Sequence, residues 1–90
     1  MAQIKIPTPL RVYTGNEATI DVEGGTVQEL LNSLVTQYPE IEQHIFSNGK
    51  LRSFVNVFLG DEDIRFLEGT DTKVDPNENL RIIPSIAGGC

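Results

Sequence analysis

The residues best suited to chemistry in this ninety-residue chain form its C-terminal segment, Ile86-Ala87-Gly88-Gly89-Cys90. This segment has nothing to pack against, and we expect it to project from the folded domain as a mobile tail. Glycine has no Cβ, so Gly88 and Gly89 can enter a narrow channel and adopt backbone conformations that other residues cannot. The small side chain of Ala87 keeps the chain narrow just before these two glycines. We therefore single out this tail, including Ile86 and Cys90, as the candidate working part of the chain.

The rest of the chain offers few groups for catalysis or metal binding. Its one cysteine excludes an internal disulfide and a cysteine-based zinc or iron–sulfur site. His44 has no second histidine with which to form a metal pair. Asp61, Glu62 and Asp63 alternate in direction and supply few converging oxygens, so a solvated turn is the favoured interpretation and partner contact the minor one. We predict no catalytic residue, no metal site and no bound cofactor.

Composition limits the kinds of partner. The chain has 13 acidic and 7 basic residues, a net charge of −6, so it lacks a basic face for nucleic acid. An acidic surface suits a basic patch on a protein partner. The apolar runs are too short to span a membrane, and the N-terminus does not resemble a signal peptide. The single thiol suggests the cytoplasm, and we expect the free chain to be a monomer.

An amphipathic helix is predicted between Thr26 and Pro39. Thr26 is suited to the N-cap position, and Glu29, three positions later, completes a capping box. Pro39 ends the helix. The apolar positions follow the spacing of one helical face; they are Val27, Leu30, Leu31, Leu34, Val35 and Tyr38.

Alternating apolar residues predict strands on both sides of this helix. These strands are Ala2–Ile6, Glu17–Val22, Leu51–Leu59, Ile64–Leu67 and Leu80–Ile83. Leu10–Thr14 can prolong the first strand before a turn at Gly15-Asn16, and Ala18 is expected to face inward with Ile20 and Val22.

The order β-β-α-β-β-β gives one helix that needs one sheet face to cover it. We predict an α+β domain of the β-grasp, ubiquitin-like type, with a mixed sheet of about five strands on one main helix. Its first and last strands should lie side by side in the sheet. The domain is assigned to residues 1–84 and the tail to residues 85–90.

The face of the sheet away from the helix is the predicted docking surface. In the last strand, Arg81 and Ile83 should face outward, and Phe54 and Phe58 on a neighbouring strand can lie beside them. Exposed aromatic and aliphatic side chains together form the kind of apolar patch that marks a partner site. The alternative is that some of these phenylalanines face the core.

The chain resembles the ubiquitin-like sulfur carrier proteins of the ThiS/MoaD superfamily, over nearly its whole length. The resemblance rests on the strand order, on the terminal Gly-Gly, and on four stretches of sequence, which are Ile6–Arg11, Leu51–Phe58, Asp61–Phe66 and Ile82–Gly89. Together these stretches are most similar to the carriers that serve cysteine biosynthesis. The carriers of the thiamine pathway are usually shorter and lack a segment like Glu62–Phe66.

The resemblance implies a carrier cycle without catalysis by the chain itself, in which the tail from Ile86 to Cys90 enters the active sites of partner enzymes. A ubiquitin-activating-type adenylyltransferase and sulfurtransferase would use ATP to adenylate the Gly89 carboxylate, and sulfur would displace AMP to leave a thiocarboxylate. The thiocarboxylate would attack an activated serine derivative on a pyridoxal-phosphate cysteine synthase, and an S-to-N acyl shift would follow. A zinc metalloprotease of the deubiquitinase type would then release cysteine.

Cys90 departs from the resting form of this family, which ends at the second glycine. While Cys90 is attached, the carbonyl carbon of Gly89 belongs to an amide and cannot be adenylated. Three interpretations remain open: a precursor extension that a protease removes, the carrier–cysteine adduct itself, or a residue added for coupling or labelling.

Other functions also remain open at this stage. The chain could be the small subunit of a molybdopterin synthase or a carrier for the thiamine pathway. In another class, it could be a ubiquitin-like modifier joined to lysines through Gly89.

Overall fold

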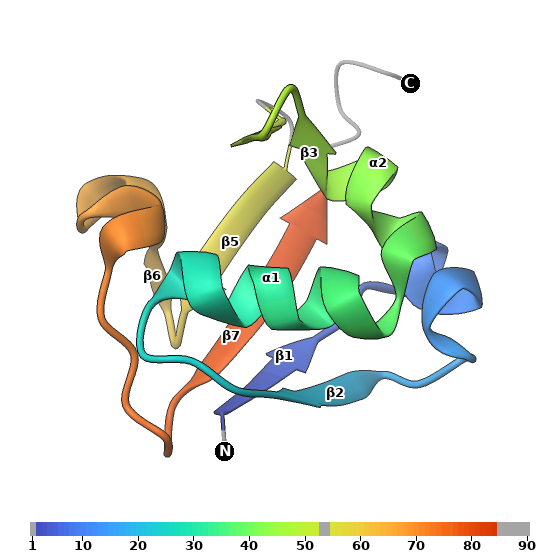
Figure 1. The fold of residues 1–90 in the computed structure, drawn as a ribbon. Helices are drawn as coiled ribbons and strands as arrows, with labels where there is room; N and C mark the ends of the chain where they lie inside the picture. The colour runs from blue at the N-terminus through green and yellow to red at the C-terminus, as the bar shows by residue number, and fades with distance from the viewer. Residues whose placement is uncertain (1, 53–54, 85–90) are drawn as a thin grey trace.

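The computed structural model describes residues 2–52 and 55–84, which form a five-stranded sheet, one long helix and a small hairpin. The sheet has the order β2-β1-β7-β5-β6 (Figure 1). β1 and β7 are parallel, and the other neighbours are antiparallel. The strands are β1 Ala2–Lys5, β2 Thr19–Val22, β5 Val55–Leu59, β6 Glu62–Asp63 and β7 Asn79–Pro84. The predicted α+β, β-grasp fold is confirmed, with the first and last strands adjacent.

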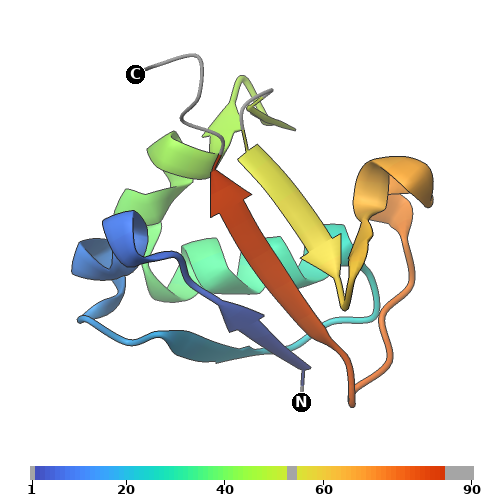
Figure 2. The same cartoon turned by 180° about the vertical axis from the view of Figure 1, so that it is seen from behind.

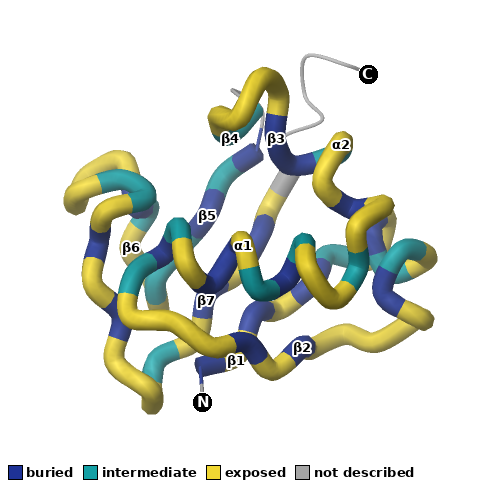
Figure 3. The backbone as a smooth tube through the Cα atoms, in the orientation of Figure 1, coloured by how far each residue is buried: buried dark blue, intermediate teal, exposed yellow. Residues whose placement is uncertain are grey.

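The core lies between the sheet and the long helix, α1 (Val27–Gln37), which crosses one sheet face. Buried and exposed residues alternate along β1, β2 and β7, as expected for strands with one face in the core (Figure 3). α1 contributes Val27, Leu30, Leu31 and Leu34, and the sheet contributes Ile4, Ile20, Val22, Val55, Val57, Leu80 and Ile82. No helix of the described residues covers the opposite face of the sheet (Figure 2).

The start of α1 follows the predicted capping pattern with one difference. The Glu29 N–H donates to Thr26 Oγ1 at 3.2 Å, which satisfies a backbone donor of the first turn. The Glu29 carboxylate accepts from the Gly25 N–H at 2.7 Å. In a capping box this carboxylate would accept from the N–H of the N-cap residue, Thr26, which is one residue later. At the other end, Tyr38 is the C-cap and Pro39 begins a 3₁₀ turn, η2 (Pro39–Ile41). A short helix, α2 (Glu42–Ile45), follows.

The prediction that residues 10–14 prolong the first strand is wrong. β1 ends at Lys5, and Thr8–Thr14 forms a 3₁₀ helix, η1. Pro7 and Pro9 lack the N–H that a strand ladder needs, and the Leu10 N–H instead donates to the Pro7 carbonyl at 2.9 Å. The predicted turn at Gly15-Asn16 is confirmed, with φ of 64° and 67°.

The side chain of Ala18 does not face inward as predicted. Ala18 is exposed, and β2 begins one residue later, at Thr19. Its carbonyl accepts from the Ile6 N–H at 2.8 Å, so the backbone pairing between the two strands continues even though the side chain lies outside the core.

The predicted strand Leu51–Leu59 is two separate elements. Leu51 belongs to β4 (Lys50–Leu51), which pairs with β3 (Phe46–Ser47) in a hairpin of its own. Asn48 and Gly49 form the turn of this hairpin with positive φ, as Asn-Gly pairs commonly do. Of the described residues in this segment, Val55–Leu59 joins the main sheet, next to the central strand β7.

The prediction of a strand over Ile64–Leu67 is also wrong. The two-residue strand β6 ends at Asp63, and Ile64–Phe66 forms a 3₁₀ turn, η3. The Asp63 carboxylate caps this turn by accepting from the Arg65 N–H at 2.9 Å. A second 3₁₀ turn, η4 (Gly69–Asp71), follows before the turn at Asp75–Glu78 leads into β7.

Candidate functional site

The central strand β7 leads directly to the predicted tail. It runs from Asn79 to Pro84, next to β1 on one side and β5 on the other. The tail residues Ile86, Ala87, Gly88, Gly89 and Cys90 lie outside the described residues, as does Phe54. Their predicted roles, and the boundary between domain and tail, therefore stay predictions. The strand that carries the tail and its surroundings can be described.

The outer face of β7 has the alternation that the sequence predicts. Leu80 and Ile82 are buried beneath α1, whereas Arg81 and Ile83 are exposed on the other side. The cross-strand partner of Arg81 on β5 is Phe58. Phe58 is half-buried on this outer face and is not part of the core. The structure thus brings Phe58, Arg81 and Ile83 together on one face.

A second cation on this face was not predicted. Lys5 of β1 is the cross-strand partner of Arg81 and is exposed. Like charges directly opposite each other on neighbouring strands are unfavourable in the free protein. The alternation of Ala2–Ile6 shows that Lys5 points away from the core, but its place beside Arg81 depends on the register between β1 and β7, which the sequence does not give.

These two cations line a shallow apolar groove at the end of β7 from which the chain continues to the tail. The volume of the groove is about 260 Å³. Arg11 also lines the groove, and its Nε donates to the Ile6 carbonyl at 3.0 Å. The lining residues are Lys5, Ile6, Pro7, Arg11, Arg81, Ile82 and Ile83. Three of the chain's seven basic residues therefore meet at one place on a protein with net charge −6. The groove combines aliphatic carbon with positive charge, which suits an acidic and apolar surface on a partner.

Asp63 of the acidic turn and His44 have structural roles. Asp61 and Glu62 are exposed, and Asp63 caps η3. The His44 ring stacks on Tyr13 with 4.3 Å between ring centroids, which gives it a packing role.

Within residues 2–52 and 55–84, no three histidine, cysteine or acidic side chains are grouped so that they could hold a metal ion. In the same part of the chain, no helix has the length and apolar character needed to cross a bilayer.

Comparison with known proteins gives the family. The model of the ThiS family matches residues 4–89, nearly the whole chain. The chain belongs to the ThiS family. The match includes Gly88 and Gly89 and leaves Cys90 outside.

Two relatives of this ThiS-family chain have the name CysO. The sulfur carrier protein CysO of Mycobacterium tuberculosis is 35% identical over 89 residues, which cover 96% of each chain. The CysO in the crystal structure of the Amycolatopsis orientalis BexX/CysO complex is 35% identical, with a TM-score of 0.91 over 99% of this chain and 100% of that one.

A third relative has a different name. The small archaeal modifier protein 1 of Methanosarcina acetivorans is 27% identical, with a TM-score of 0.89 over 98% of this chain and 95% of that one. Ubiquitin-like sulfur carriers and modifiers therefore share the fold of this ThiS-family chain, and the fold alone does not separate the two functions.

Proposed function

We propose that this chain is a sulfur carrier protein that bears sulfur as a thiocarboxylate on Gly89 and serves cysteine biosynthesis. The proposal is supported chiefly by the full-length similarity to CysO, together with a family match that ends at Gly89. In this role the chain is a protein-borne cosubstrate that acts in the cytoplasm. Partner enzymes perform the chemistry on its tail.

The first step converts a poor electrophile into a good one. An adenylyltransferase joins the Gly89 carboxylate to AMP from ATP and releases pyrophosphate. A sulfide equivalent from a sulfurtransferase then attacks the acyl carbon, and AMP leaves. The product, a thiocarboxylate, is a stronger nucleophile toward carbon than the original carboxylate.

The second step transfers the sulfur. The sulfur of the thiocarboxylate replaces the activated oxygen on the β-carbon of a serine derivative held by a pyridoxal-phosphate cysteine synthase, and that oxygen leaves with its activating group. The acyl group then moves from sulfur to nitrogen. The result is a cysteine joined to Gly89 by an amide bond, which is the bond between Gly89 and Cys90 in this chain. A zinc metalloprotease of the deubiquitinase type hydrolyses this bond and restores the free Gly89 carboxylate. Both a precursor and a loaded carrier would have this sequence.

The outer face of the sheet is the docking surface that we assign to the activating enzyme. Lys5 and Arg81 lie side by side there, next to Ile83, on the strand that continues into the tail. An enzyme that draws in the tail must approach this end of β7. Acidic groups on the enzyme would relieve the repulsion between the two cations. Because this repulsion is present in the free carrier, its relief would make the free energy of binding more favourable.

We expect Arg81→Glu to raise the KM of the activating enzyme for the carrier by about tenfold, because the variant places a carboxylate against an acidic partner surface. The fold should tolerate the change, since the new carboxylate lies opposite Lys5. Lys73→Glu makes the same charge change at another exposed position and serves as the control. Equal KM values for the two variants would contradict this docking surface.

A lysine-linked modifier is the second candidate function, favoured by the similarity to the small archaeal modifier protein. Reconstitution separates the two functions. The carrier ending at Gly89 is incubated with the activating enzyme, ATP and a sulfur donor, and its intact mass is measured. A gain equal to the replacement of one oxygen by sulfur supports the carrier. Conjugates to lysine without that mass would support the modifier and overturn the carrier proposal.

A further inference from the structure

The most exposed large apolar side chain among the described residues is Phe66, in the 3₁₀ turn η3. It is 82% exposed, and its neighbour Leu67 is 39% exposed. Exposed apolar side chains are common singly, but two in succession at a fixed turn form a small apolar knob. The knob lies along the β5 edge of the sheet, on the opposite side of the molecule from η1 (Figure 1).

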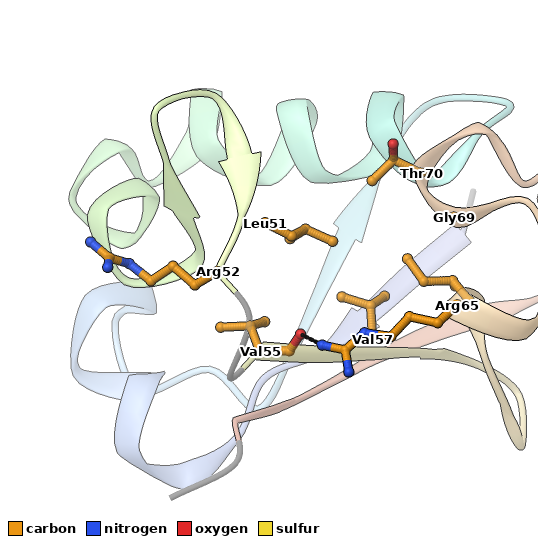
Figure 4. A pocket seen from close by; sticks show the side chains of 8 residues that line it. Leu51, Arg52, Val55, Val57, Arg65, Gly69 and Thr70 are labelled. Atoms are coloured by element: carbon orange, nitrogen blue, oxygen red, sulfur yellow. Dashed lines mark hydrogen bonds between the residues drawn. The ribbon is translucent and has the colours of Figure 1, made fainter. Parts of the chain in front are cut away.

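The knob is held rigidly by its neighbours. Ile64, two residues before Phe66, is buried in the core at 3% exposure. The Arg65 guanidinium donates to the Val55 carbonyl at 3.2 Å (Figure 4). The Glu68 N–H donates to Thr72 Oγ1 at 3.0 Å. Phe66 therefore faces solvent because the turn is fixed in that orientation. A preformed knob loses little conformational entropy when a partner covers it.

An apolar cavity lies beside the turn. Its volume is about 400 Å³, and it opens between β4, β5 and the turns η3 and η4 (Figure 4). The lining residues are Leu51, Arg52, Val55, Val57, Ile64, Arg65, Gly69 and Thr70. A partner surface that accepts Phe66 could at the same time place an apolar side chain in this cavity. We call Phe66, Leu67 and the mouth of the cavity the edge surface.

The charge around the edge surface is opposite to that of the groove. The segment from Asp61 to Asp71 has five acidic residues and one basic residue, Arg65. Asp61, Glu62, Glu68 and Asp71 are exposed. Such a rim complements a basic protein surface. An enzyme that brings ATP and a carboxylate together must present cations to offset their negative charge.

The edge surface is also near the start of the tail. Arg65 bonds to Val55, and Val55 is the cross-strand partner of Pro84, the last described residue. A partner that takes up the tail therefore reaches η3 from β7 by crossing a single strand. The basic groove and the acidic edge surface lie on opposite sides of β7, so a partner with complementary charges can bind in one orientation only.

Resting on the proposed function, we propose that the edge surface is a second docking site for the tail-activating enzyme, which receives Phe66 in an apolar pocket with a basic rim. Aromatic side chains buried at the centre of an interface commonly dominate the binding energy. The basic rim would mainly increase the rate of association.

The test is the affinity of the full chain, Met1–Cys90, for the purified activating enzyme from the same organism. Phe66→Ser is expected to raise the Kd by about tenfold. Val12→Ser removes another exposed apolar side chain, 68% exposed, from η1 and is expected to change the Kd by less than about twofold. Equal Kd values for the two variants would overturn this proposal alone.

The charge of the rim is tested by association rates at several salt concentrations. Glu68→Lys is expected to lower the association rate constant about threefold and to weaken its dependence on salt. Glu40→Lys, an exposed site on η2, is the control and should leave both unchanged. Equal association rates for the two variants would contradict a basic rim around the enzyme's pocket. A carrier ending at Gly89 that is never adenylated would overturn the proposed function and this proposal with it.

Discussion

We expect a chain ending at Gly89 to be adenylated by its activating enzyme, and the chain ending at Cys90 not to be. This is the largest effect that we expect from any change in the protein, a complete loss of the reaction. In the chain ending at Cys90, the acyl carbon of Gly89 is bound to the nitrogen of Cys90, so Gly89 has no carboxylate with which to attack ATP. The measurement is ATP–pyrophosphate exchange with each form. Removal of Cys90 by a metalloprotease should restore the reaction.

Gly89→Ala in the shortened chain is the matched variant for this test. It keeps a free carboxylate but adds a Cβ at the reacting residue, so we expect adenylation to fall by about tenfold or more. Folding should not change, because the described core lies between Ala2 and Ile82. Normal adenylation of the full chain would contradict the requirement for a free Gly89 carboxylate. Normal adenylation of the alanine variant would contradict the narrow channel.

Gly24→Ala is expected to lower the free energy of unfolding by about 2–4 kcal/mol, the largest effect on stability from a single methyl group. Gly24 has a φ of 152°, and a Cβ there would lie 2.6 Å from Glu29 Cβ. The helix cannot easily move away, since the Val27 N–H donates to the Thr72 carbonyl at 3.0 Å and the Val74 N–H to the Gly25 carbonyl at 2.9 Å. Urea denaturation measures the change.

The neighbouring Gly25→Ala is the control for this stability test. The nearest atom to a Cβ at Gly25 is the Glu29 Oε1 at 3.6 Å, an ordinary contact with the end of a side chain. We expect its unfolding free energy to change by less than about 1 kcal/mol. If the two variants were equally stable, the close approach of Gly24 to α1 would not limit the fold.

The sequence predicts best those elements whose pattern is long and whose ends carry specific residues. The helix from Val27 to Gln37 has an uninterrupted apolar stripe, a capping threonine and a terminating proline, and each is confirmed. The outward direction of Arg81 and Ile83 follows from strand alternation and is confirmed as well. Such patterns are determined locally, so tertiary contacts need not be known.

Short segments were predicted less well. Leu10–Thr14 and Ile64–Leu67 have apolar residues at spacings that fit either a strand or a 3₁₀ turn, and hydrogen bonds to Pro7 and Asp63 favour the turn. The candidate site was also only partly predictable. Lys5 joins Arg81 through the register of two strands that are far apart in the sequence, and Phe66 becomes exposed because η3 replaces a strand.

The intact mass of the protein from its source cell shows whether Gly89 carries sulfur. We expect a population ending at Gly89, part of which is heavier by the difference between one sulfur and one oxygen atom. A form with Cys90 attached should also be present, and its share should rise when the metalloprotease is removed. If every molecule retains Cys90 under all conditions, Gly89 never bears a free carboxylate, and the sulfur-carrier account would be contradicted.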